Sequence, residues 1–264
     1  MSAPKKSLGQ HWLRDTSILS AIVEASEVSQ GDNVLEVGPG QGTLTSVLLS
    51  AGVNLTAVEY DFELFEELGK NINRFPNPHN LKIVNEDILK FDLTKLPKDY
   101  KVVANIPYYL TSNLIRLLSE SKNPPRSITL LVQKEVAERI CAAPGQMSLL
   151  SVSAQNYYEV KLDIIVPAEE FIPPPKVDSQ VVHMTRRKQP ISSPLNEKTF
   201  FRIVKAGFSS RRKTLLNSLS GGLNLPKDTV SNTLSEYNIN PSSRPQELDL
   251  LQWKKLAEAF GGGA

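Results

Sequence analysis

The fold is decided by the stretch Val34-Leu35-Glu36-Val37-Gly38-Pro39-Gly40-Gln41-Gly42-Thr43-Leu44-Thr45. A short apolar run leads into three glycines at alternate positions, and a helical pattern follows from Thr43 to Ala51. The apolar run predicts a buried strand, and glycines in the turn let backbone N–H groups approach a ligand near the positive end of a helix. Strand, glycine turn and helix form the first half of a Rossmann-type nucleotide site, although a tight turn without a ligand can have the same pattern.

Two further features narrow the kind of ligand. The dinucleotide fingerprint has a third glycine at position 43, and Thr43 stands there instead, which counts against NAD and FAD. A second apolar run, Leu55 to Val58, ends in Glu59, which lies 21 residues after Gly38. A carboxylate at that strand end can accept both hydroxyl hydrogens of a ribose, and the alternative is a solvated acid. Glycine turn and acid together resemble the S-adenosylmethionine (SAM) site of Rossmann-type methyltransferases.

Composition sets the general class of the protein. The chain has 264 residues, of which 40% are hydrophobic and 22% charged, as in ordinary globular proteins. No apolar stretch reaches the ~20 residues of a membrane span, and the first residues lack the apolar core of a secretory signal. The single cysteine, Cys141, excludes an internal disulfide and a multi-cysteine metal site. We therefore expect a cytoplasmic protein with no membrane association and no metal.

Charge is distributed unevenly along the chain. Residues 1–185 hold 17 Lys and Arg against 22 Asp and Glu, a balance of −5, and residues 186–264 hold 13 against 6, a balance of +7. Such asymmetry indicates a C-terminal part that faces a polyanion, or simply a solvated basic face. Residues 186–196, rich in proline, serine and basic side chains, are expected to link the two parts. We thus predict domains at 1–185 and 186–264.

Periodicity gives the fold class. Apolar strand patterns alternate with helical patterns through the first domain, which predicts an α/β, doubly wound, Rossmann-like sheet. The expected strands are 34–37, 55–59, 81–84, 101–104 and 128–133, followed by a hairpin-like pair at 156–166 and 180–185. The expected helices of this domain are 16–27, 43–51, 62–73, one beginning at Thr111 or Ser112 with either residue as its cap, and 134–143. Helical patterns at 198–207, 211–219, 227–237 and 245–260 predict a small helical C-terminal domain.

The fourth strand runs directly into Asn105-Ile106-Pro107-Tyr108, which has the composition of a site for an exocyclic amine. Such an amine is a poor nucleophile because its lone pair is delocalised into the ring. The Asn105 amide oxygen and the Ile106 carbonyl can accept its hydrogens, Pro107 stiffens the turn, and Tyr108 offers a face for a base. Asp87, at the end of the third strand, can accept from an adenine amine or serve as a turn residue.

Here the resemblance to a family becomes specific. Asn105 to Tyr108 is similar to the motif of adenine-N6 methyltransferases, with isoleucine second as in the ribosomal RNA enzymes. The arm Gly9-Gln10-His11-Trp12-Leu13 is similar to Gly-Gln-Asn-Phe-Leu of that family, and Phe171 with residues 173–179 matches its substrate-side loop. Residues 208–219 resemble the C-terminal signature of the KsgA group, the small-subunit ribosomal RNA adenine N6,N6-dimethyltransferases. The resemblance extends from Gly9 to Phe260.

The resemblance implies a function, a cofactor and a site. Members of the group dimethylate two adjacent adenosines in a hairpin loop near the 3′ end of small-subunit rRNA, within an assembling subunit. It implies SAM as methyl donor and a stacking role for Phe171. The positive balance of the C-terminal part and the adjacent cations Arg211, Arg212 and Lys213 predict RNA contacts there, the alternative being a solvated basic helix. We expect a monomer. The implied cofactor site, together with Gly40 of the turn, comprises His11, Leu13, Gly38, Glu59, Asp87 and Asn105. His11 and Trp12 depart from the family pattern, so the contact of His11 is open.

Two alternatives remain at the level of sequence. An Erm-type enzyme, which methylates large-subunit rRNA, shares the sheet and the Asn105-to-Tyr108 motif, but residues 208–219 favour the KsgA group. A non-catalytic ribosome-assembly factor on the same fold is disfavoured by the intact motif and by Glu59.

Overall fold

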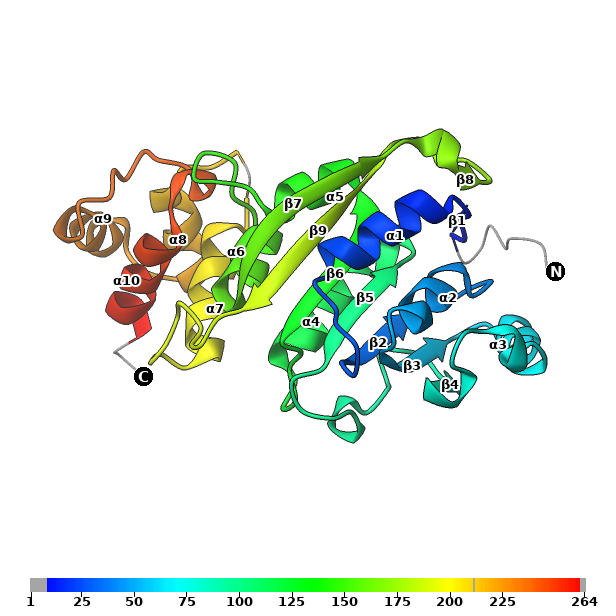
Figure 1. The fold of residues 1–264 in the computed structure, drawn as a ribbon. Helices are drawn as coiled ribbons and strands as arrows, with labels where there is room; N and C mark the ends of the chain where they lie inside the picture. Colours follow the sequence, from blue (N-terminus) through cyan, green and yellow to red (C-terminus); the bar gives the residue numbers. More distant parts are fainter. Residues whose placement is uncertain (1–8, 211, 262–264) are drawn as a thin grey trace. The chain divides into compact units, whose positions relative to one another are not determined.

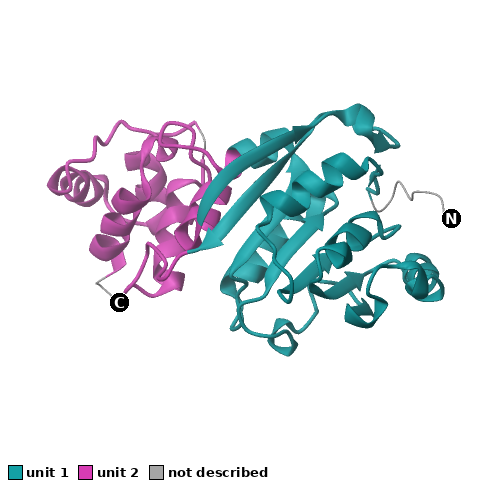
Figure 2. Cartoon of the chain, viewed as in Figure 1, with its two compact units in different colours: residues 1–138, 159–186 teal, residues 139–158, 187–264 magenta. Residues whose placement is uncertain are grey.

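The computed structural model describes residues 9–210 and 212–261 of the chain. They group into two units (Figure 2). Unit 1 takes residues 1–138 and 159–186, and unit 2 takes residues 139–158 and 187–264. Residues 139–158 thus group with the C-terminal helices, although the residues that follow them, 159–186, belong to unit 1.

Unit 1 is built on a seven-stranded sheet with the strand order β4-β3-β2-β5-β6-β9-β7 (Figure 1). Its strands are β2 (Asn33–Val37), β3 (Asn54–Glu59), β4 (Leu81–Asn85), β5 (Lys101–Asn105), β6 (Ser127–Gln133), β7 (Tyr158–Val166) and β9 (Ser179–Arg186). The five strands from β4 to β6 are parallel, and β9 runs antiparallel to β6. The order reverses between β2 and β5, which is where open α/β sheets bind ligands at their carboxyl ends.

Helices cover both faces of this sheet. The helices α1 (Thr16–Ala25) and α2 (Thr43–Ser50) lie together on one face, and α4 (Thr111–Glu120) and α5 (Lys134–Ile140) lie on the other (Figure 1). The helix α3 (Phe62–Lys70) connects β3 to β4. Buried leucines of α1 and α2 join Val34, Leu55 and Ala57 of the strands in one apolar core. Burial of both sheet faces explains the continuous apolar runs of the central strands.

The Rossmann-like fold class predicted from the sequence is confirmed, with differences at element ends. β7 begins at Tyr158 because Asn156 and Tyr157 belong to a helix, α6 (Leu149–Tyr157), which periodicity did not predict. β7 and β9 are neighbours, as the hairpin-like pattern suggested. The expected side-chain cap of α4 is absent: a short 3-10 turn over Tyr108–Leu110 leads into this helix, and the Thr111 hydroxyl donates to the Tyr108 carbonyl instead.

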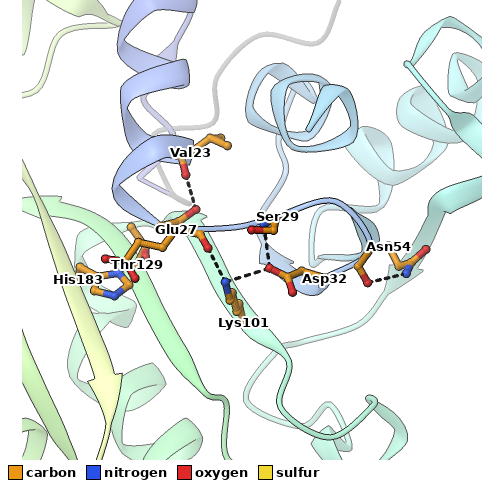
Figure 3. A network of polar contacts seen from close by, with 10 residues as sticks. Val23, Glu27, Ser29, Asp32, Asn54, Lys101, Thr129 and His183 are labelled. Atoms are coloured by element: carbon orange, nitrogen blue, oxygen red, sulfur yellow. Dashed lines mark hydrogen bonds and ion pairs between the residues drawn. The ribbon is translucent and has the colours of Figure 1, made fainter. Parts of the chain in front are cut away.

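A polar network ties the amino ends of the strands to the segment between α1 and β2 (Figure 3). The Lys101 ammonium donates to the Glu27 carbonyl and lies 2.9 Å from an Asp32 carboxylate oxygen. The same carboxylate accepts from the Ser29 N–H at 2.8 Å. Burial alone would raise the pKa of Asp32, but the hydrogen bond and the charge of Lys101 outweigh burial and lower it. The network anchors the start of β2, whose other end carries the glycine turn.

Unit 2 is helical. Besides α6 it contains α7 (Glu197–Gly207), α8 (Leu215–Leu223), α9 (Lys227–Glu236) and α10 (Leu250–Gly261). Its core surrounds the fully buried Trp253 and includes Phe200, Ile203 and Val152. A methyl group on Gly207 would lie 2.3 Å from the Trp253 ring, so a residue without Cβ is required where α7 meets α10. None of the helices in the described parts of the chain is long and apolar enough to cross a membrane.

The predicted start of the second C-terminal helix is wrong by four residues. α8 begins at Leu215, and Thr214 caps it by accepting from the Asn217 N–H. Arg212 and Lys213 are exposed and precede the helix, whereas Arg211 lies outside the described residues. Two cations therefore stand beside the positive end of α8, where the helix dipole does not favour them.

Candidate active site

A cavity of about 320 Å³ opens at the carboxyl ends of β2, β3, β4 and β5 in unit 1. Four segments far apart in the sequence form its walls: the N-terminal arm, the glycine turn, the ends of β3 and β4, and the turn after β5. All of the predicted cofactor residues line this cavity: His11, Leu13, Gly38, Gly40, Glu59, Asp87 and Asn105. Three more of the predicted catalytic residues also line it: Ile106, Pro107 and Tyr108.

The glycine turn has the backbone that its residue types suggested. Gly38, Gly40 and Gly42 have φ values of +66°, +57° and +79°, in the left-handed region that side chains disfavour. Nothing lies within 4 Å of a Cβ placed on Gly38, so the cavity reaches the backbone there. A Cβ on Gly42 would lie 2.6 Å from the Phe75 ring, so this glycine is needed for packing rather than for ligand approach.

Glu59 is fixed by two backbone donors. Its Oε2 accepts from the Gly40 N–H at 3.1 Å, and its Oε1 accepts from the Asp61 N–H at 2.8 Å. Burial raises the pKa of the Glu59 carboxyl, and these two hydrogen bonds partly offset the rise. The carboxylate is thus held against the glycine turn, with acceptor capacity left for a ligand's hydroxyl groups.

Glu36 is a site residue that the sequence analysis missed. It lies in β2, its side chain is 1% exposed, and it lines the cavity. The Thr45 hydroxyl donates to its Oε2 at 2.7 Å. Burial, with a smaller contribution from the Glu59 charge, raises the pKa of Glu36 to about 8. An acid in the middle of an apolar strand, two residues before the glycine turn, was the signal that could have identified it.

The N-terminal arm lies next to the glycine turn. The short strand β1 (Trp12–Leu13) pairs with β8 (Phe171–Ile172), and the Leu13 carbonyl accepts from the Thr43 hydroxyl at 3.0 Å. The His11 Nδ1 lies 2.7 Å from the Pro173 carbonyl, an acceptor only, so Nδ1 carries the proton. In this tautomer Nε2 is the ring nitrogen left to accept from a ligand, and the cofactor contact of His11 stays a prediction.

The turn after β5 presents two acceptors. The Asn105 amide nitrogen donates to the His11 carbonyl at 3.5 Å, which fixes the amide and turns its oxygen away from the arm. None of the described donors bonds the Asn105 Oδ1 or the Ile106 carbonyl. The Tyr108 hydroxyl is 3.0 Å from the Ser179 hydroxyl, and its ring stacks on His11 with centroids 6.0 Å apart.

Asp87 follows β4, beside Glu86, and both line the cavity. One Asp87 oxygen accepts from the Leu89 N–H at 3.0 Å. The residue therefore serves as a turn aspartate and also lines the cavity, so the two interpretations of Asp87 are compatible.

The structure does not bring two of the predicted groups to the cavity. The Phe171 side chain is 2% exposed, packs in the apolar core with Leu13, and does not line the cavity. In this structure it supports the arm rather than offering a free face to a base. Arg212 and Lys213 belong to unit 2.

Charge distinguishes this cavity from a phosphate site. Among the described residues that line it, four carry carboxyl groups and none is lysine or arginine; the acids are Glu36, Glu59, Glu86 and Asp87. Such a lining favours a ligand with net positive charge and disfavours a pyrophosphate. No cluster of three or more His, Cys, Asp or Glu side chains in the described ranges could hold a metal ion.

Comparison with known proteins gives a consistent result. A model of the family described as ribosomal RNA adenine dimethylase matches residues 1–260. Ribosomal RNA small subunit methyltransferase A of Dehalococcoides mccartyi is 40% identical, over 98% of this chain and 89% of the relative. The crystal structure of a dimethyladenosine transferase from Plasmodium falciparum superposes with a TM-score of 0.78 at 28% identity, covering 95% of this chain and 98% of the other. The 23S rRNA methyltransferase ErmE gives 0.74 at 26% identity, covering 95% and 99%.

Alanine substitutions at the three glycines should separate backbone strain from steric conflict. Gly38→Ala and Gly40→Ala should each lower the free energy of unfolding by about 1–2 kcal/mol, the cost of a left-handed non-glycine residue. Gly42→Ala should lower it by a further ~1–3 kcal/mol, because its methyl group conflicts with Phe75. Urea unfolding followed by circular dichroism measures the three values. Equal losses at all three positions would contradict the role given to Gly42.

Proposed function

The chain belongs to the ribosomal RNA adenine dimethylase family, and from that premise we propose that it methylates the N6 amine of adenosines in small-subunit rRNA with SAM as the donor. The product would be N6,N6-dimethyladenosine at two adjacent positions in a hairpin loop near the 3′ end of that RNA, in a subunit under assembly in the cytoplasm. The observation that carries the proposal is the meeting, in one cavity, of the glycine turn, Glu59 and the Asn105-to-Tyr108 turn.

The residues of the cavity fit SAM better than a dinucleotide. When bound, SAM would supply a methyl group that is carried on a positively charged sulfur. Four acidic side chains and the absence of lysine and arginine among the described lining residues suit that positive charge. In this proposal Glu59 accepts from the ribose hydroxyls, and Asp87 accepts from the adenine amine of the cofactor. The backbone at Gly38 and Gly40 leaves room for the cofactor. His11 and Leu13, on the N-terminal arm, would cover its remaining side.

The chemistry at the target amine requires acceptors rather than a strong base. The Asn105 Oδ1 and the Ile106 carbonyl would accept the two amine hydrogens, which aims the nitrogen lone pair toward the donor methyl. Pro107 fixes the turn, and Tyr108, held by Ser179, would stack on the base. In the transfer the amine nitrogen would bond to the donor methyl carbon as the bond between that carbon and the sulfur breaks, so the sulfur would leave uncharged. The positive charge would pass to the nitrogen and be lost with one N6 proton to water. A nitrogen in that cationic state is acidic, so no strong base is needed next to the amine. Phe171 would act here by holding β8 against β1.

The second candidate is an Erm-type enzyme acting on large-subunit rRNA. The similarity of the fold to that of ErmE is the observation that favours this candidate. Two observations support the small-subunit enzyme instead. A relative that matches nearly the full length of this chain is named as a small-subunit methyltransferase, and residues 208–219 carry the signature of the KsgA group.

RNA docking is proposed for unit 2, in the C-terminal domain predicted at 186–264. Arg212 and Lys213 are exposed and adjacent, and Arg211 precedes them in the sequence. Like charges beside the positive end of α8 do not stabilise the fold, so a phosphate partner explains them better.

Glu59→Ala should weaken SAM binding by roughly 1.5–3 kcal/mol, because hydrogen bonds to a charged group are lost. Calorimetric titration of the purified protein with SAM measures the change. Glu24→Ala, at an exposed position on α1, is the matched control and should bind as wild type does. Unchanged affinity in a folded Glu59→Ala variant would remove this residue from the cofactor site.

Asn105→Ala should keep the fold and the binding of small subunits but lose most methyl transfer, by roughly 10²-fold or more, because one of the two amine acceptors is gone. Methyl incorporation into undermethylated small subunits is the assay. Asn113→Ala, an exposed asparagine on α4, makes the same chemical change away from the cavity and should be fully active. Near-normal dimethylation by Asn105→Ala would refute this mechanism.

Arg212→Glu combined with Lys213→Glu should weaken subunit binding and flatten its dependence on salt, since each lost phosphate contact removes roughly 0.7–0.9 from the log–log slope. SAM affinity should not change, because the cofactor cavity lies in unit 1. Lys227→Glu combined with Lys255→Glu alters net charge equally at other exposed positions of unit 2 and should have a smaller effect. Wild-type slopes in the first variant would show that RNA docks elsewhere.

A further inference from the structure

Glu36 has a feature that the proposed reaction does not use. Its Oε2 is held by the Thr45 hydroxyl at 2.7 Å, but no described residue bonds its Oε1. The side chain is 1% exposed and lines the cofactor cavity. One oxygen of a buried carboxyl is thus anchored, and the other remains available to whatever fills the cavity. An unpaired buried acid normally persists only where a ligand or a proton compensates it.

The surroundings of Glu36 oppose its ionisation. The helix α2, which supplies Thr45, has no titratable residue. On β3, the charged side chain that acts on Glu36 is Glu59. The sole titratable residue of β5 is Lys101, which lies at the end of that strand opposite to Asn105 and the cavity. Across the cavity stand Glu86 and Asp87 after β4, with His11 on the arm, and α1 contributes only the exposed Glu24. Near neutral pH these protein surroundings therefore favour the protonated form of this acid, consistent with its pKa of about 8.

We propose that Glu36 is a specificity residue that senses the charge of the bound cofactor: its carboxyl loses a proton when the cationic methyl donor fills the cavity and regains one when the neutral-sulfur product replaces it. The proposal rests on the proposed function, because it requires SAM to bind at this site. A positive sulfur inside a low-dielectric cavity stabilises a nearby carboxylate, whereas the uncharged sulfide of S-adenosylhomocysteine stabilises it less. The proton is exchanged with solvent, and no covalent bond to Glu36 is involved.

The consequence for binding follows from proton linkage. If only the ionised form of Glu36 pairs well with the donor, binding releases up to one proton, and the affinity for SAM rises with pH by at most tenfold per unit. The rise ends where the carboxyl is already ionised in the free protein, near pH 8. The affinity for the product depends less on pH. Glu36 would thereby distinguish SAM from S-adenosylhomocysteine by the positive charge on the sulfur, which only SAM carries.

Calorimetric titration in two buffers of different ionisation enthalpy, at pH 7, tests the proposal. Wild type should release close to one proton on binding SAM and clearly fewer on binding S-adenosylhomocysteine. Glu36→Gln, which keeps the shape of the neutral side chain, should release none with either ligand and should lose the rise in SAM affinity between pH 6 and 8. Thermal unfolding checks that this variant is folded.

Two further variants assign the proton to this carboxyl. Glu59→Gln, the other acid of the cavity with a raised pKa, should bind SAM more weakly but still release the proton. Thr45→Val removes the hydroxyl that favours ionisation, so the pH at which SAM affinity levels off should move upward. Equal proton release with both ligands, or release that persists in Glu36→Gln, would overturn the role of Glu36 while leaving SAM binding intact. Failure of wild type to bind SAM at all would overturn the proposed function itself.

Discussion

The hydrogen bond from the Gly40 N–H to the Glu59 carboxylate joins the two halves of the cofactor site. Gly40 belongs to the turn after β2 and Glu59 ends β3, and their strands are paired in parallel register along their length. The bond exists because Gly40 adopts a left-handed backbone that points its N–H toward the neighbouring strand end. Once it forms, the turn, the acid and the start of α2 become a single unit, against which the arm can then pack through the Thr43–Leu13 contact.

Acidity is the second property that organises the site. Placing Glu36 and Glu59 at one sheet edge costs free energy, since burial disfavours the ionised form of each and the charge of Glu59 further opposes that of Glu36. The protein limits that cost by giving Glu59 two backbone donors and Glu36 one hydroxyl donor. A cationic ligand would relieve the remaining repulsion. The same buried acids that cost free energy would therefore make the cavity selective for a positively charged donor.

The catalytic turn depends on support from outside its own segment. Asn105 is oriented by the His11 carbonyl, and Tyr108 by Ser179 on β9. The arm that carries His11 is in turn held by β8, where Phe171 is buried against Leu13. Three segments, each more than 60 residues from this turn in the chain, thus fix its position. Preorganised acceptors of this kind are what an amine with a delocalised lone pair requires.

The sequence by itself determined the order of strands and helices in unit 1, the glycine turn, the acid at the end of β3, and the Asn105-to-Tyr108 turn. Each of these is recorded locally, in hydrophobic periodicity or in a few adjacent residue types, so no distant contact is needed to see it. Only the tertiary structure decided that Glu36 faces the cavity, that Phe171 packs in the core, and that α6 groups with the C-terminal helices. These features depend on which side of a strand faces which neighbour, and on contacts between segments far apart in the chain. The protonation of Glu36 is the clearest case, because the same side chain in an unfolded chain would be ionised near neutral pH, and burial in the folded sheet raises its pKa to about 8.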